Sequence, residues 1–562
     1  MIQALRQAAR PSTVLLCRPT GLGRPRLLLP WRTASRPRHP GCRGFSSSGA
    51  QHEAAAERRW STPLAKQLAE AISATGPVPV ASYMRMCLTS DLGGYYTGAL
   101  DKTGRDPFGR AGDFVTSPEV SQVFGELVGI WFVAEWMAQG RPSRGVELIE
   151  VGPGRGTLMD DILRTVRHFG LAQSIESVYM VEASPQLRLA QKTLLCGHDV
   201  ALTESSLGYH GVSKHGSLPI VWTETIQSIP QSLENMSFIV AHEFFDALPI
   251  HVFQSVAVPA GQGSSTEGSS REIDTTTSTI PSSSTITTST TTSTTSTTSS
   301  TTTSPIPSST CTSSNSSSSH QWREMVVSST PPGSTHDSLR TPPSQQRDGP
   351  PPDFQLTLST GATRHSRYLP QLSPRYQALA AIPGVVVEVC PDAALYATDF
   401  AVRIGGSAAR PRPHPAGAAL ILDYGPGDGT VPINSLRGIR RHRRVSPFAE
   451  PGLTDLSADV DFGAIVEAAV RASDRVELHG PVDQADFLLQ MGIRERAQAL
   501  AAKAAASPAA SSSSTPSDID RSWKRLVDRG PGGMGKVYKV LAILPENDGR
   551  RRPVGFGGDV AQ

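Results

Sequence analysis

The stretch that decides the fold is a predicted strand followed by three glycines at alternate positions: Val146-Glu147-Leu148-Ile149-Glu150-Val151-Gly152-Pro153-Gly154-Arg155-Gly156-Thr157-Leu158. Residues 146–151 combine four branched apolar residues with two glutamates and predict a buried strand, and residues 158–169 predict a helix. Glycines between a strand and a helix let the backbone turn tightly and let a ligand approach closely. The stretch therefore predicts a strand–loop–helix unit with a ligand site at its loop.

Two classes of nucleotide-binding protein that use glycine loops can be tested against this spacing. A phosphate-binding NTPase loop requires Gly-Lys-Ser/Thr, whereas Gly156 is followed by Thr157 and Leu158. A dinucleotide-binding loop requires GxGxxG, but here the third glycine comes one residue early, which disfavours a nicotinamide-dependent oxidoreductase. A tight turn without any ligand remains an alternative, although Glu150 before the loop and Glu182 after the next strand make it less favoured.

Predicted helices and strands alternate along the rest of the chain. Helices are predicted at 63–73, 79–88, 117–137 and 185–195, and strands at 177–181, 218–222, 237–241, 385–389 and 418–422. In the longest helix, Ser117 is the predicted N-cap and Pro118 lies in the first turn. Strands that alternate with helices predict an α/β fold with a doubly wound, mostly parallel sheet. Here that sheet carries an N-terminal helical extension and additional C-terminal elements.

The first 45 residues differ sharply in charge from the remainder. They contain nine arginines and no lysine or acid, and without them 44 basic and 50 acidic residues remain, a net charge of −6. A net-acidic body argues against nucleic-acid binding or broad attraction to anionic membranes. The segment 1–45 has the composition of a mitochondrial transit peptide, with a chloroplast address as the main alternative. No apolar run approaches the roughly 20 residues of a membrane span.

Composition also divides the body. We expect a first part of the folded domain, with its N-terminal helical extension, at 60–255, a disordered Ser/Thr-rich insertion at 256–352 with a strand at 321–327, a second part of the domain with the C-terminal elements at 353–545, and a disordered tail at 546–562. Long surface insertions cost little, because loop-closure entropy grows only with the logarithm of length. The cysteines show no metal-ligand spacing, so no metal site is predicted.

A pair of acids follows the strand predicted at 237–241. His242-Glu243-Phe244-Phe245-Asp246 lies at the carboxyl end of that strand, where a doubly wound sheet places its ligand-facing loops. Carboxylates match the donor fork of a guanidinium group bidentately. Glu243 and Asp246 are therefore candidates to bind a planar cation. The alternative is that Asp246 caps a turn and Glu243 is solvated.

Several motifs in one order resemble a known family. They are the glycine loop, Tyr95-Tyr96, residues 112–126 (GDFVTSPEVSQVFGE), 243–249 (EFFDALP), 421–425 (ILDYG), 451–462 (PGLTDLSADVDF) and Met534-Gly535. Together they resemble the MidA-like mitochondrial protein arginine methyltransferases, the complex I assembly factor 7 group. The resemblance runs from about residue 63 to residue 544, interrupted by the Ser/Thr-rich insertion.

The resemblance implies a class I methyltransferase fold with S-adenosyl-L-methionine as cofactor. It further implies symmetric dimethylation of an arginine on an iron–sulfur-arm subunit of respiratory complex I, in the mitochondrial matrix, during complex I assembly. The implied catalytic residues are Glu243 and Asp246, and the implied cofactor-binding residues are Thr116, Ser117, Pro118, Glu150, Gly152, Gly154, Gly156, Glu182 and His242. Glu150 would face the methionine end of the cofactor, and Glu182 would accept its ribose hydroxyls.

One position departs from the family pattern, because His242 stands where the family usually has Asn. Histidine titrates near neutral pH, so it could present a charge where an amide would not. This departure and the long insertion motivate a second hypothesis. In it the chain is a catalytically inactive assembly factor that keeps the methyltransferase fold and binds a complex I subunit. The sequence does not indicate the oligomeric state.

Overall fold

The computed structural model describes residues 58–102, 112–258, 320–339, 350–506 and 515–557. These residues belong to one compact unit that begins at Arg58. The transit peptide predicted at 1–45 lies outside the described residues, as do 259–319 and 340–349 of the predicted insertion.

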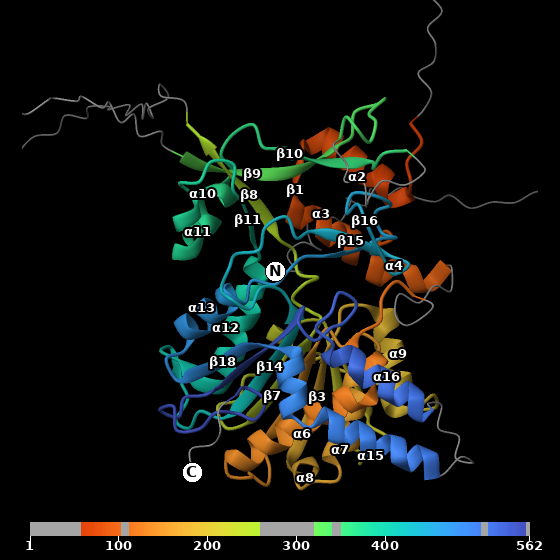
Figure 1. The fold of residues 1–562 in the computed structure, drawn as a ribbon, viewed down its shortest axis with the longest axis vertical. Helices are drawn as coiled ribbons and strands as arrows, with labels where there is room; N and C mark the ends of the chain where they lie inside the picture. Colours follow the sequence, from red (N-terminus) through yellow and green to blue (C-terminus); the bar gives the residue numbers. More distant parts are fainter. Residues whose placement is uncertain (1–57, 103–111, 259–319, 340–349, 507–514, 558–562) are drawn as a thin grey trace, which may run out of the picture. The chain divides into compact units, whose positions relative to one another are not determined.

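A nine-stranded sheet forms the centre of the unit (Figure 1). Its five middle strands are parallel and lie in the order β14 (Gly417–Tyr424), β7 (Met236–His242), β2 (Val146–Val151), β3 (Ile175–Val181) and β6 (Pro219–Thr223). Antiparallel strands extend it, β19 (Tyr538–Pro545) and β18 (Val476–Asp483) beyond β14, and β5 (Tyr209–Val212) and β4 (Thr203–Glu204) beyond β6. The predicted α/β fold with a mostly parallel sheet is confirmed.

Helices cover both faces of this sheet. On β2, Leu148 points into one hydrophobic core and Ile149 into the other, as strand alternation requires. The first core is closed by α6 (Gln122–Ala138), α7 (Thr157–Val166), α15 (Ile493–Ala506) and α16 (Pro516–Val527), and α9 (Pro185–Cys196) contributes to it. The second is closed by α12 (Pro391–Gly405) and α13 (Phe462–Ala472). Helices from the C-terminal part of the chain therefore cover both faces of the sheet, beside the helices that follow the glycine loop on one of them.

A second sheet packs against the N-terminal helices α2 (Pro63–Thr75) and α3 (Val80–Thr89). It contains β1 (Val78–Pro79), β9 (His320–Ser329), β8 (His251–Ala257), β11 (Val386–Val389) and β10 (Phe354–Leu358). Strand β9 covers the strand predicted at 321–327 and pairs antiparallel with β8. The strand predicted at 385–389 exists as β11. It joins β8 antiparallel in this second sheet, so its expected place in the parallel sheet was wrong.

The helix predicted at 117–137 is two helices. α5 (Ser117–Val120) ends at Ser121, whose backbone is extended, and Ser121 then begins α6 by accepting a hydrogen bond from the Val123 amide at 3.3 Å. The N-cap of α5 is Thr116 rather than the predicted Ser117, and the Glu119 carboxylate accepts from the Thr116 amide at 3.2 Å. A serine can start a helix as readily as interrupt one, and apolar periodicity does not reveal which occurs.

Shorter elements complete the unit. They are α4 (Tyr95–Lys102), α8 (Leu171–Ser174), α10 (Arg364–Tyr368), α11 (Pro374–Leu379), α14 (Gln484–Gln490), the small strands β12 (Gly406–Ser407) and β13 (Arg410–Pro411), and a three-stranded sheet of β16 (Arg443–Val445), β15 (Arg437–Arg440) and β17 (Asp455–Ser457). None of the helices in the described segments is both long enough and apolar enough to span a bilayer.

The segment 546–557 is ordered against the body, so the disordered tail predicted at 546–562 was placed too early. Arg551 pairs with the buried carboxylate of Glu135 through two contacts of 2.9 and 2.6 Å. The Trp131 indole donates to the Val554 carbonyl at 3.1 Å, and Phe556 packs edge-on against Trp131. The arginines and glycines of this segment suggest disorder by their polar composition. One of these arginines, Arg551, nevertheless pairs with the buried Glu135 of α6 and so anchors the segment.

We expect Arg551→Met to lower the free energy of unfolding by about 2–3 kcal/mol, because the buried Glu135 carboxylate then loses both of its charge-assisted hydrogen bonds. Arg550→Met is the matched control. Arg550 pairs with Asp548 on the surface, and such pairs contribute less than about 1 kcal/mol. Urea unfolding of the two variants measures the difference, and equal losses would contradict the assigned role of Arg551.

Candidate active site

The glycine loop follows β2 and enters α7 with all three glycines in the left-handed region. Gly152, Gly154 and Gly156 have φ of 65°, 52° and 84°. The Gly152 amide donates to the Val181 carbonyl at 3.1 Å, which holds the loop against the end of β3. A Cβ on Gly152 would lie 2.5 Å from Cδ2 of Phe244. Glycine is therefore required both by the backbone angle and by the close approach of Phe244.

Two acids lie at the carboxyl ends of β2 and β3. Glu150 and Glu182 are both buried, and burial raises the pKa of Glu182 to about 7. The pKa of Glu150 is raised well above its usual range, mainly by burial and to a smaller extent by the charge of Glu182. Oε2 of Glu150 has no hydrogen-bond partner in the protein. The structure thus brings the two predicted acids together beside the glycine loop.

Gln191 on α9 links Glu182 to the glycine loop, a role that the sequence did not predict. Its Nε2 donates to the Gly154 carbonyl at 2.7 Å and to Oε2 of Glu182 at 3.2 Å. Its Oε1 accepts from the Trp222 indole at 3.0 Å, which fixes the orientation of the amide. The only available signal was a glutamine among the apolar positions of the helix predicted at 185–195.

The second acidic group lies on the turn after β7. Glu243 has φ of 48°, an uncommon value for a residue with a side chain. The buried carboxylate of Asp423, on β14, accepts through Oδ2 from the amides of Phe244, Phe245 and Asp246 at 3.1, 2.9 and 3.4 Å. Three successive amides directed at one oxygen hold the turn in its strained shape.

Glu243 is not solvated, which rules out one of the two alternatives left by the sequence. Its side chain is 12% exposed, and Oε1 lies 3.4 Å from the Ser117 amide and 3.5 Å from Nε2 of His242. Burial, together with the charges of Asp246 and Asp423, raises the pKa of Glu243 well above its usual range. Glu243 therefore lies beside α5, the helix that carries the predicted residues Ser117 and Pro118.

The side chain of Asp246 interacts with the backbone of its own turn and with residues distant in the sequence. Its Oδ2 accepts from the Tyr424 hydroxyl, and its backbone carbonyl accepts from the Ala458 amide at 2.9 Å. Asp455 accepts from the Tyr96 hydroxyl at 3.0 Å, and burial, then the charge of Asp246, raises the pKa of Asp455 to about 7. Four acids thus share one buried region, namely Glu243, Asp246, Asp423 and Asp455.

Basic and phenolic groups border this acidic region. The Arg437 guanidinium lies 4.6 Å over the Tyr424 ring, pairs with Asp459 at 2.6 Å, and counteracts the burial that raises the pKa of Asp246. The Tyr538 side chain lies near Glu243 and counteracts the burial that raises the pKa of Glu243. The sequence assigned no role to these residues, although Tyr424 lies within a motif that carried the family resemblance.

His242 is a neutral imidazole. It is buried, and burial lowers its pKa to about 3. Its ring meets that of Phe124 edge-on, with centroids 5.1 Å apart. The residue that departs from the family pattern consequently adds no positive charge next to Glu243.

Three of the predicted cofactor residues carry a buried polar atom that makes no hydrogen bond within the protein. These atoms are Oγ of Ser117, Oε2 of Glu150 and Nε2 of His242. Burying a polar atom without a hydrogen bond costs free energy, so such atoms mark places where a ligand fits. Arg155 in the glycine loop pairs with Glu119 of α5 at 3.4 Å, which links the two segments. These residues fit a polar, positively charged cofactor.

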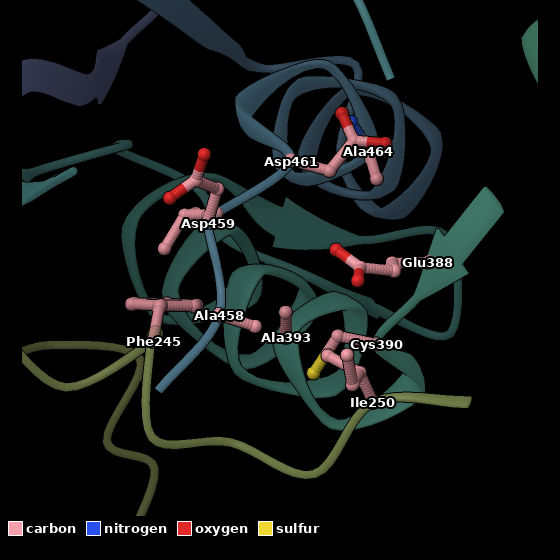
Figure 2. A pocket seen from close by; sticks show the side chains of 10 residues that line it. Phe245, Ile250, Glu388, Cys390, Ala393, Ala458, Asp459, Asp461 and Ala464 are labelled. Carbon is pink, nitrogen blue, oxygen red and sulfur yellow. The ribbon is translucent and has the colours of Figure 1, made fainter. Parts of the chain in front are cut away.

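A small pocket lies beside the turn at 243–249 (Figure 2). Phe245 and Ile250 line it together with Glu388, Cys390 and Asp461. Its lining includes neither Glu243 nor the acids beside the glycine loop. The pocket is therefore separate from the predicted cofactor and catalytic residues.

Comparisons with known proteins agree with this geometry. A family model described as a putative S-adenosyl-L-methionine-dependent methyltransferase matches residues 127–482. The rat protein named protein arginine methyltransferase NDUFAF7, mitochondrial, is 32% identical over 90% of this chain and 89% of its own length. The human protein of that name is 32% identical over 86% and 84% of the two chains.

A solved structure shares the fold. It is a likely methyl transferase from Burkholderia thailandensis bound to S-adenosyl-homocysteine, with a TM-score of 0.54, 21% identity, and coverage of 88% of this chain and 92% of that one.

We expect Asp423→Ala to lower the free energy of unfolding by roughly 3 kcal/mol or more, because three buried amides lose their acceptor. Amide exchange of peptides covering 243–249 should also accelerate, and Asp423→Asn, which keeps an acceptor oxygen, should accelerate it less. Asp428→Ala on the exposed loop after β14 is the control. Unchanged exchange in Asp423→Ala would contradict the positioning role.

Proposed function

The chain belongs to the family of putative S-adenosyl-L-methionine-dependent methyltransferases, and we propose that it transfers the methyl group to arginine in a protein substrate. The observation that carries this proposal is the set of buried carboxyl groups around Glu243. A buried carboxylate is stable only when it is paired. A substrate guanidinium supplies the missing positive charge together with five donors in a planar fork.

The cofactor residues in this proposal are those of the glycine loop and its surroundings. When bound, S-adenosyl-L-methionine supplies a methyl group activated by the sulfonium charge. Glu182 would accept hydrogen bonds from the ribose, and Gln191 already orients the Glu182 carboxylate. Glu150 would meet the cationic methionine end with its unpartnered Oε2, and α5 would close the site through residues 116–118.

Glu243 is the proposed residue that orients the guanidinium. A carboxylate paired with one edge of the planar guanidinium localises the positive charge on the nitrogens of that edge. The remaining nitrogen is then available as the nucleophile. Methyl transfer also releases a proton from that group, and the raised pKa makes the Glu243 carboxylate a suitable acceptor. Asp246, fixed by Tyr424, is the proposed second carboxylate. Asp423 positions both through the backbone.

The substrate and the setting are inferred from the relatives. Those relatives are named as mitochondrial arginine methyltransferases, and the arginine-rich segment 1–45 has the composition of a mitochondrial address. We therefore propose that the chain works in the mitochondrial matrix and forms symmetric dimethylarginine on a complex I subunit during assembly. If the protein bound the cofactor but methylated no protein in a matrix extract, the inactive assembly factor would be favoured instead.

We expect Glu243→Gln to reduce methylation by roughly 100-fold or more, because the neutral amide neither pairs with a guanidinium nor accepts its proton. Binding of S-adenosyl-L-methionine, measured by calorimetry, should change little. Glu234→Gln, at an exposed position just before β7, is the matched control. Activity of Glu243→Gln equal to that of the control would overturn the proposed role.

The affinity for S-adenosyl-L-methionine should rise with pH through about 7. The pKa of Glu182 in the free protein is about 7, well above its ordinary value, so the carboxyl is protonated below that pH. Ribose hydroxyls donate to the ionised form, so binding favours loss of the proton and weakens by about fivefold between pH 7 and pH 6. Glu182→Gln should bind more weakly and with no such dependence. The same pH profile in the variant would show that another group is responsible.

A further inference from the structure

Two histidines and a glutamate converge on the second sheet, away from the acids of the proposed active site. His251 is the first residue of β8, Glu324 lies on the neighbouring strand β9, and His365 lies on α10, which packs over β9 (Figure 1). His251 and Glu324 are buried, whereas the His365 side chain is 46% exposed. The potential ligand atoms of all three lie within 4.8 Å of one another.

The distances suit a small metal ion. Oε1 of Glu324 lies 2.8 Å from Nδ1 of His251 and 3.3 Å from Nδ1 of His365. A tetrahedral zinc ion with ligands at about 2.1 Å separates neighbouring ligand atoms by roughly 3.4 Å. The contact between His251 and Glu324 would therefore have to open by about 0.6 Å to admit the ion, whereas that between His365 and Glu324 already has nearly the required length. The exposed side of His365 leaves room for water as a fourth ligand.

The surroundings also resemble the support of a metal site. Thr363 donates from Oγ1 to Oε2 of Glu324 at 2.5 Å, which fixes the carboxylate. Such outer hydrogen bonds commonly orient metal-ligating carboxylates. The centroids of the two imidazole rings are 4.3 Å apart, and Nδ1 of each ring faces the carboxylate: that of His251 faces Oε1, and that of His365 lies between the two oxygens, 3.3 Å from Oε1 and 3.4 Å from Oε2.

We propose that His251, Glu324 and His365 bind one divalent transition-metal ion of the zinc class. Two imidazoles and one carboxylate are a ligand set that zinc accepts. The cysteine spacing could not indicate this site, because its ligands come from three separate segments and include no thiolate. Metal binding is coupled to folding, so the ion would fasten α10 onto the β8–β9 hairpin. A hydrogen-bonded cluster without metal is the competing explanation.

The test is equilibrium dialysis of the full chain against Zn²⁺, followed by metal analysis and thermal unfolding. The wild type should retain one zinc ion per chain, and zinc should raise its Tm. His365→Gln should bind zinc at least about tenfold more weakly and lose the Tm increase. Because His365 is half-exposed, this variant is expected to fold.

His414→Gln, at an exposed position on the loop before β14, is the matched control and should behave as the wild type does. Glu324→Gln provides a second variant that removes the anionic ligand and should also lose the ion. If the wild type retained no zinc, or if His365→Gln retained as much as the control, the hydrogen-bonded cluster alone would account for these residues and the proposal would be overturned.

Discussion

The arrangement of the active site depends on one carboxylate. Asp423 ends the apolar run of β14, and its Oδ2 receives the amides of Phe244, Phe245 and Asp246 from the turn after β7. β14 and β7 are parallel neighbours, so their carboxyl ends meet at one edge of the sheet. That single acceptor holds Glu243 in a left-handed conformation and places Phe244 against Gly152. The turn at 243–249, proposed to be catalytic, and the glycine loop, proposed to bind the cofactor, are consequently positioned relative to each other through backbone contacts.

Buried negative charge is the second constraint. Glu150 and Glu182 occupy the ends of two adjacent strands, and Glu243, Asp246 and Asp455 occupy the neighbouring region. Burial raises the pKa of each of these acids, which means that the free protein holds them at a cost in free energy. A sulfonium cofactor and a guanidinium substrate are both cations. Binding of these two proposed cations would offset the cost, so the same charges that disfavour the empty site would favour the loaded one.

The local parts of this arrangement could be predicted from the sequence, and the long-range parts could not. The strand at 146–151 and the glycine loop depend on residues within one short segment, and the structure reproduces them. Asp423 acts on a turn about 180 residues earlier, and its role becomes visible only once β14 is known to pair with β7. The role of Gln191 could not be predicted either, because its contacts with Gly154 and Trp222 become visible only once the fold is known.

Two errors have a simple physical cause. The strand at 385–389 was assigned to the parallel sheet because alternation does not say which sheet a strand joins. The end of the chain was assigned to disorder because polar composition does not reveal a buried partner such as Glu135.

The central claim is that the buried acids select arginine as the methyl acceptor. It is tested most directly by incubating the wild-type protein with methyl-labelled S-adenosyl-L-methionine and a mitochondrial matrix extract, followed by amino-acid analysis of the labelled protein. The account predicts label in methylated arginine and none in methylated lysine. Label confined to lysine, or no label in protein although the cofactor binds, would contradict it.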